Sequence, residues 1–197
     1  MLLSQDEARF PLVPTLRATL GVKGYRPVVG TWDNKDHVQC FAALNVVTGQ
    51  LTTRLLEQPA RCKAKTGQSK QQRLQAAFAA HLGDIAQAYP ASGYPQVVII
   101  IDNAPWHRGT QMEQVLQAHP HLQVYRLPSY SPQLNVIERF WRVLRRRATH
   151  NRLFTTMAAL RATLRHNISY FQTVRHKVLS LIESPRKAKK EAKLAGA

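Results

Sequence analysis

The chain has 197 residues, of which 44% are hydrophobic, and this is enough for one domain with a substantial core. Its 28 Lys and Arg residues outnumber its 11 Asp and Glu residues, which gives a net charge of +17. The longest apolar runs have about five residues, so a transmembrane helix is excluded. The excess of positive charge favours a nucleic-acid partner over a membrane surface, because no basic amphipathic helix stands apart from the predicted fold.

The sequence gives no sign of secretion. Asp6 and Glu7 stand where a signal peptide would need its apolar region. Two cysteines, Cys40 and Cys62, are too few for a disulfide framework or a zinc site, and Cys40 is expected in the core. We therefore expect a cytoplasmic protein.

The first predicted elements are three strands and a helix. Residues 2–7 are expected to form a short strand that ends on two acids. Residues 37–47 and 50–57 are expected to form an antiparallel pair joined by the turn Thr48-Gly49. A helix is expected from about Ser69 to Tyr89, because apolar residues recur three and four positions apart.

The second half alternates strands and helices. The apolar run 97–101 predicts a strand buried on both faces, and residues 122–127 predict another. Helices are expected to start near Pro105, at Ser131 with Pro132 in first position, and over about residues 155–180. The order βββαβαβαα predicts an α/β fold over residues 1–182, with a central mixed five-stranded sheet flanked by helices. The basic segment 183–197 is expected to be a disordered tail.

Three acidic residues occupy positions that are typical of catalytic or ligand-binding groups. Asp102 directly follows the buried strand 97–101, where open α/β sheets place ligands, although an Asp there also commonly caps a turn. Asp6 ends the predicted first strand, which is expected to lie beside that strand. Glu7 is the alternative to Asp6, because neighbouring strand residues face opposite sides. Glu138 borders the apolar stripe of its predicted helix, made of Leu134, Ile137, Trp141 and Leu144.

These acids predict a metal site. Two strand-end Asp residues and one helical Glu offer only hard oxygen ligands, which suit Mg²⁺ or Mn²⁺ rather than zinc. Two such ions about 3.5–4 Å apart can activate an attacking oxygen and stabilise a leaving one. The sequence therefore predicts metal-dependent chemistry on phosphates.

Two motifs resemble the catalytic core of DDE transposases. The first is Ile-Ile-Asp102-Asn103-Ala-Pro-Trp-His107, and the second is Leu127-Pro-Ser-Tyr-Ser-Pro-Gln-Leu-Asn135-Val-Ile-Glu138-Arg-Phe-Trp141. The 35 residues between Asp102 and Glu138 are similar to the spacing in that family. The segment 5–10 resembles the family's first motif. The nearest relatives by this resemblance are bacterial insertion sequences of the mariner superfamily (insertion-sequence 630 type).

The resemblance implies a ribonuclease H-like fold in which Asp6, Asp102 and Glu138 hold two divalent ions. It also implies a double-stranded DNA substrate, strand cleavage by water at transposon ends, and attack of the freed 3′-hydroxyl on target DNA. A homodimer is expected. The family often has Pro where this chain has Val136, and relatives carry helix-turn-helix modules before the first Asp. Only five residues precede Asp6 here, so an upstream DNA-reading portion is an expected partner.

Several neighbouring residues are candidates for supporting roles. His107 could orient water or contact DNA, or it could be a surface residue at the start of a helix. Asn103 is a supporting candidate, and Asn135 is expected to cap or orient the helix of Glu138. Trp106 and Trp141 are expected in the core. Five arginines close together on that helix cannot all form intrahelical pairs, which favours DNA contacts for Arg139, Arg142, Arg145, Arg146 and Arg147.

Three functions fit these observations. The first is the catalytic domain of a transposase that cleaves and joins DNA strands. The second is a transposase remnant without catalysis, which binds DNA or full transposase as a regulator. The third is a stand-alone nuclease of similar fold that cleaves but does not join. The three acids favour the first function, and the absent helix-turn-helix modules favour the second.

Overall fold

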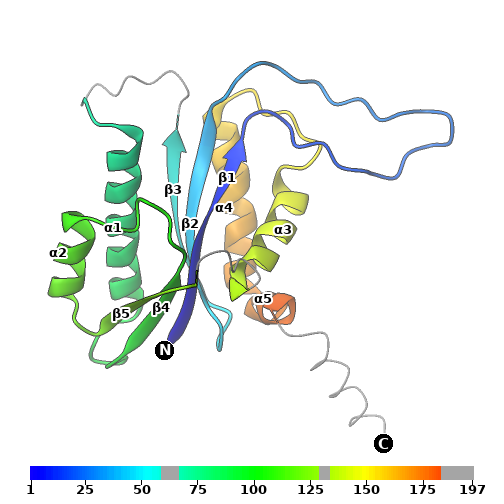
Figure 1. Ribbon diagram of the computed structural model, residues 1–197. Coiled ribbons are helices and arrows are strands. Elements are labelled where there is room, and N and C mark those ends of the chain that lie inside the picture. The colour runs from blue at the N-terminus through cyan, green and yellow to red at the C-terminus, as the bar shows by residue number, and fades with distance from the viewer. Residues whose placement is uncertain (59–66, 129–133, 183–197) are drawn as a thin grey trace, which may run out of the picture.

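The computed structural model of the chain describes residues 1–58, 67–128 and 134–182. Its centre is a five-stranded sheet with the order β3-β2-β1-β4-β5 (Figure 1). The central strand β1 pairs antiparallel with β2 and parallel with β4, and β4 pairs parallel with β5. This confirms the predicted mixed sheet. The strands are β1 (Leu2–Pro11), β2 (His37–Asn45), β3 (Leu51–Gln58), β4 (Val97–Ile101) and β5 (Leu122–Arg126).

Helices cover both faces of the sheet (Figure 1). One face carries α1 (Lys70–Ala88) and α2 (Thr110–Ala118), and the other carries α3 (Ile137–Ala148), α4 (Met157–Thr173) and α5 (Arg175–Ile182). The helix expected over about residues 155–180 is therefore two helices, because the chain leaves helical geometry at Val174. Ser69 begins α1 with a capping box to Gln72, as its sequence favours.

The strand β1 is longer than its sequence predicted. It continues past Glu7 to Pro11, because Ala8 and Phe10 alternate into a buried core and the ladder with β2 extends to the pair Pro11 and His37. Asp6 therefore lies in the middle of the strand, and the prediction that it ends the strand was wrong. The parallel ladder with β4 pairs Ser4 with Ile100. Two residues further along each chain, Asp6 is level with the end of β4.

One helix begins later than predicted, and the predicted start of another cannot be compared with the described residues. The helix expected near Pro105 starts at Thr110, because residues 102–107 form turns and Gly109 adopts a φ of 117° just before the helix. In the segment before Glu138, the described helix starts at Ile137. The predicted start at Ser131 and Pro132 lies outside the described residues. Leu134 is 53% exposed, so its place in the apolar stripe was wrong.

Side chains of β1 alternate between two separate cores. Ala8 and Phe10 pack in the core beneath α3 and α4, whereas Leu3 packs in the core beneath α1. Asp6 shares the parity of Ala8, and Glu7 that of Leu3. The two neighbouring acids therefore face opposite sides of the sheet.

A long connection leaves the sheet between β1 and β2. Residues 12–36, here called the arm, run in an extended path away from the body of the fold (Figure 1). Several apolar side chains of the arm are exposed to solvent: Leu16, Leu20, Val22, Tyr25 and Val28.

The predictions for the two cysteines and for the C-terminal segment can be compared with the structure only in part. Cys40 is fully buried, as expected, whereas Cys62 and the tail 183–197 lie outside the described residues. Among the described helices, none is long and apolar enough to cross a membrane.

We predict that Leu144→Ala lowers the free energy of unfolding by about 2–5 kcal/mol, because Leu144 is fully buried where α3 meets the sheet and its loss leaves a cavity. Leu134→Ala is the matched control, and its exposed side chain should change stability by less than about 0.5 kcal/mol. Urea denaturation of both variants measures the difference. Equal losses would contradict the position of α3 on the sheet.

Candidate functional site

Asp6 lies in the centre of the sheet, against α3. Its residue is only 7% exposed, and the indole Nε1 of Trp141 donates a hydrogen bond of 3.0 Å to its Oδ2. Trp141 is fully buried on the inner face of α3. The expected core position of this Trp is confirmed, and the indole N–H additionally fixes the carboxylate of a candidate site residue.

The surroundings of Asp6 disfavour its charge. Burial raises the pKa of Asp6 from 3.8 to about 7, and the nearby negative charges of Glu7 and Glu138 raise it further. Hydrogen bonds from the Glu7 backbone and from Trp141 oppose this increase. Asp6 is thus a buried carboxylate among like charges, and such a group is stabilised by a proton or by a bound cation.

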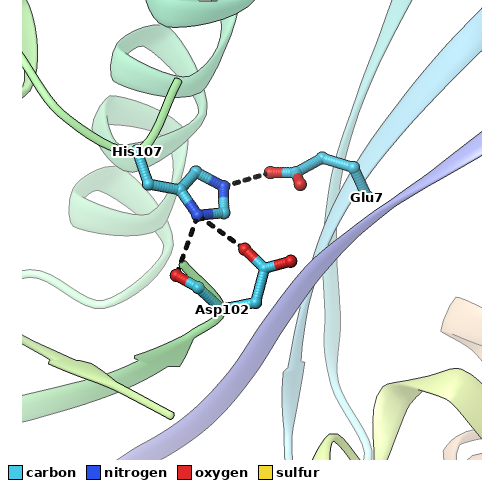
Figure 2. Close-up of side chains that lie close together, drawn as sticks. All are labelled: Glu7, Asp102 and His107. Atoms are coloured by element: carbon cyan, nitrogen blue, oxygen red, sulfur yellow. Dashed lines mark hydrogen bonds and ion pairs between the residues drawn. The ribbon is translucent and has the colours of Figure 1, made fainter. Parts of the chain in front are cut away.

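Glu7 points to the opposite face of the sheet and contacts His107 (Figure 2). Its Oε1 lies 2.7 Å from Nε2 of the imidazole, while Nδ1 of the same ring lies 2.9 Å from Oδ1 of Asp102. The His107 side chain is fully buried, the Glu7 side chain is 3% exposed and the Asp102 side chain is 46% exposed. The imidazole therefore bridges two carboxylates that come from β1 and from the end of β4.

This bridge favours a protonated His107. Burial lowers the pKa of His107, but the hydrogen bonds to Asp102 and Glu7 outweigh burial and raise the pKa to about 9. The same hydrogen bond from His107 lowers the pKa of Asp102. His107 is buried before α2, so the interpretation of it as a surface residue at a helix start was wrong.

The described residues contain one compact group of potential metal ligands, formed by Glu7, Asp102 and His107 within 4.8 Å of one another. An imidazolium at the centre of this group pairs with both carboxylates and offsets one of their two negative charges, which makes the group an ion triad rather than an open metal site. Asp6 and Glu138 lie outside it. Asp102 belongs to this triad, because its Oδ1 accepts from the Ala104 backbone and faces His107, whereas its Oδ2 makes none of the described contacts. The predicted set Asp6, Asp102 and Glu138 does not form such a compact group among the described residues.

Glu138 lies in the first turn of α3 and is exposed. The start of this helix is tied to β1, because Ser4 Oγ donates a bond of 2.8 Å to Oδ1 of the buried Asn135. Of the two roles expected for Asn135, capping is wrong, because the first flanking residue of the helix is Val136. The orienting role stays a prediction. Asn103 donates 2.7 Å to the Leu127 carbonyl and ties the end of β4 to the chain after β5.

The five predicted DNA-contacting arginines divide into two groups. Three make contacts within the protein. Arg139 donates to the Ile182 carbonyl, the Arg145 guanidinium lies 5.7 Å from the centre of the Phe10 ring, and Arg147 lies 4.1 Å from the centre of the Tyr170 ring. The other two, Arg142 and Arg146, are exposed and line a cavity of about 1050 Å³ beside the arm.

Two contacts at this site were not predicted from the sequence. Trp141 was assigned to the core without a polar partner, although its position three residues after Glu138 places both on adjoining faces of one helix. Arg126, at the end of β5, donates to the His107 carbonyl and holds the loop that carries the imidazole. Its strand-end position beside Asp102 was the available signal.

Comparisons with known proteins agree on one family. Residues 1–161 match the family described as DDE superfamily endonuclease. The insertion element IS630 uncharacterized 39 kDa protein of Shigella sonnei is 26% identical over 162 residues, which cover 82% of this chain and 43% of that protein. The chain thus spans less than half the length of this curated relative.

Solved structures show the same fold. A pre-cleavage Mos1 transpososome matches with a TM-score of 0.61 and 15% identity, over 92% of this chain and 53% of that chain. The catalytic domain of Mos1 mariner transposase matches with a TM-score of 0.56 and 14% identity, over 92% of this chain and 78% of that chain. The expected ribonuclease H-like fold is confirmed.

We predict that Asp6→Asn stabilises the metal-free chain at pH 8. Because the folded pKa of about 7 exceeds 3.8, the folded state keeps a proton that the unfolded state releases, and wild-type stability falls as pH rises through this window. The full shift corresponds to at most about 4 kcal/mol. Thermal unfolding in EDTA should show a gain in melting temperature that is small at pH 4 and largest above pH 7. The exposed Asp33→Asn is the control, and a pH-independent difference for Asp6→Asn would contradict the account.

We predict that the His107 imidazole titrates near pH 9 in NMR spectra of histidine-labelled protein. Glu7→Gln keeps a hydrogen-bond acceptor but removes a charge, so the pKa should fall toward 6.5. The stabilising effect of the charged ring is complete below pH 6.5 and is lost as pH rises through about 9. The exposed Glu113→Gln, on α2, should leave the titration unchanged. A His107 pKa near 6.5 in the wild type would disprove the bridge.

Proposed function

The chain belongs to the DDE superfamily of endonucleases, and we propose that it is a transposase catalytic domain that cleaves and joins DNA strands at transposon ends. In this proposal Asp6, Asp102 and Glu138 hold divalent metal, either Mg²⁺ or Mn²⁺, as two ions. The observation that carries it is the position of Asp6, a carboxylate level with the end of β4 whose pKa is raised by burial and then by the charges of Glu7 and Glu138.

The chemistry of the proposed ligands fits a divalent cation. Three carboxylates supply hard oxygen ligands, and Asp6 is a buried acid whose neighbouring charges are negative. Bound divalent ions would lower the pKa of an attacking oxygen and stabilise the leaving oxygen of a phosphodiester. Asp6 rather than Glu7 is the proposed ligand, because Glu7 faces the other side of the sheet and contacts His107.

The neighbouring residues position these carboxylates. Trp141 orients Asp6 through its indole N–H, and His107 engages one oxygen of Asp102 while the other is left for a ligand. The bond between Ser4 and Asn135 sets where α3 begins, and hence where Glu138 stands. Such outer contacts commonly contribute tenfold to a hundredfold to metal affinity or activity.

The proposal includes partners. A similar Mos1 transposase structure is a paired-end complex with the left transposon end, and the basic charge of this chain supports DNA as the substrate here. We propose a homodimer, which the exposed apolar side chains of the arm support. We also propose that an upstream portion reads the transposon ends, and that the reaction takes place in the cytoplasm, at the nucleoid.

We predict that Asp102→Asn and Glu138→Gln each reduce metal-dependent cleavage by more than about a hundredfold, because each removes a proposed ligand charge at nearly constant volume. Nicking and strand transfer on short duplex DNA, with Mg²⁺ or Mn²⁺, measure the effect. The matched control is Glu113→Gln, which removes an exposed carboxylate on α2.

The products separate the candidate functions. Cleavage with joined product supports the transposase, whereas cleavage without joining favours a stand-alone nuclease. DNA binding with no cleavage, also after addition of an upstream DNA-reading portion, would favour a regulatory remnant. Cleavage that survives in both acid variants would disprove the assigned site.

A further inference from the structure

A basic groove lies between the arm and the end of α3, outside the carboxylate site. Nine residues line this cavity of about 1050 Å³, and none of the nine is acidic. Its positive charge comes from three separate segments: Arg17 in the arm, Arg142 and Arg146 on α3, and Arg152 after α3. We call these four residues the arginine groove.

Asn151 bonds the arm to the segment that follows α3. The Arg17 backbone N–H donates 2.8 Å to Oδ1 of Asn151, and Nδ2 of Asn151 donates 2.9 Å back to the Arg17 carbonyl. The Asn151 backbone N–H donates 3.1 Å to the Thr15 carbonyl, and Thr15 and His150 form an isolated parallel bridge. Asn151 has a φ of 57°, a left-handed conformation that Asn tolerates better than most residues. These contacts of Asn151 and His150 with Thr15 and Arg17, here called the seam around Asn151, bring Arg17 to the end of α3.

The positive charges that line the groove repel one another. Arg142 and Arg146 are four residues apart on one face of α3, where like charges destabilise a helix. His150 also lines the cavity, and burial together with the charges of Arg17, Arg145 and Arg146 lowers its pKa. A cluster of cations without acids among its lining residues is stabilised when an anion binds.

The size and direction of the groove favour a long anion. Glu138, Arg142 and Arg146 stand on successive turns of α3, so the arginines lie about 6 and 12 Å along the helix from the carboxylate. One DNA strand presents a phosphate about every 3.4 Å along its axis. Several consecutive phosphates can therefore follow α3 from the carboxylates into the groove.

We propose that the arginine groove binds the phosphodiester backbone of DNA beside the cleaved position, and that Asn151 is a positioning residue that supplies Arg17 to it. This inference rests on the proposed function for the identity of the polyanion. It assigns to the seam around Asn151 a role in substrate binding, and it extends the DNA-contacting set beyond α3.

Equilibrium binding of the full chain to a short labelled DNA duplex tests the proposal. Fluorescence anisotropy in EDTA, at several salt concentrations, measures affinity without cleavage. Arg17→Ala should weaken binding and reduce the salt-dependence slope by about 1, because one phosphate contact is lost. Arg17 is exposed, so its replacement leaves the core intact. Arg165→Ala, which removes an exposed arginine on α4 outside the groove, should have a smaller effect on both quantities.

Asn151→Gly distinguishes the positioning role from charge alone. This variant removes no charge and tolerates the left-handed backbone, but it loses both side-chain bonds to Arg17. It should weaken binding, and the double variant with Arg17→Ala should bind no more weakly than the weaker single variant. Additive losses, full affinity in Asn151→Gly, or equal effects of Arg17→Ala and Arg165→Ala would overturn the proposal. Since the assay contains no metal, failure of cleavage alone would count only against the proposed function.

Discussion

The arrangement of the site depends on the alternation of β1 at two adjacent acids. Asp6 and Glu7 differ by one position, so the strand sends one carboxylate toward α3 and the other toward α1. The free-energy cost of burying the charge is offset in a different way for each carboxylate. Glu7 finds the buried imidazole of His107, whereas Asp6 receives only weak compensation from the Trp141 indole and the backbone. A register shift of one residue would exchange these roles, and the ladders of β1 with β2 and β4 prevent it.

Asp102 is a member of the ion triad with Glu7 and His107 and is also one of the proposed metal ligands. One of its oxygens is held by His107 and the Ala104 backbone, which fixes the carboxylate at the end of β4. Its half-exposed position leaves the group open to solvent and substrate, unlike Asp6 or Glu7. In the proposed function the ion triad supports Asp102 from behind, while the uncompensated burial of Asp6 favours a bound cation. Both effects are electrostatic.

The parts of the fold set by strong local patterns were predictable. The apolar run 97–101 identified β4 and hence Asp102, and the apolar spacing after Ser69 identified α1. The length of β1 was not, since the alternation of Ala8 and Phe10 was overlooked beside the acids. The start of α3 depends on a tertiary bond between Ser4 and Asn135, 131 positions apart, which no local pattern contains. For the same reason the sequence could leave Asp6 and Glu7 as alternatives but could not show that His107 faces Glu7.

We propose that a divalent metal binds on the α3 side of β1, away from the ion triad. Anomalous diffraction from crystals soaked in Mn²⁺ locates the ion without requiring activity. We expect anomalous density between Asp6, Asp102 and Glu138, with the contact between His107 and Glu7 retained. Density centred between Glu7, Asp102 and His107, with the imidazole turned to the ion, would rule out this position of the metal.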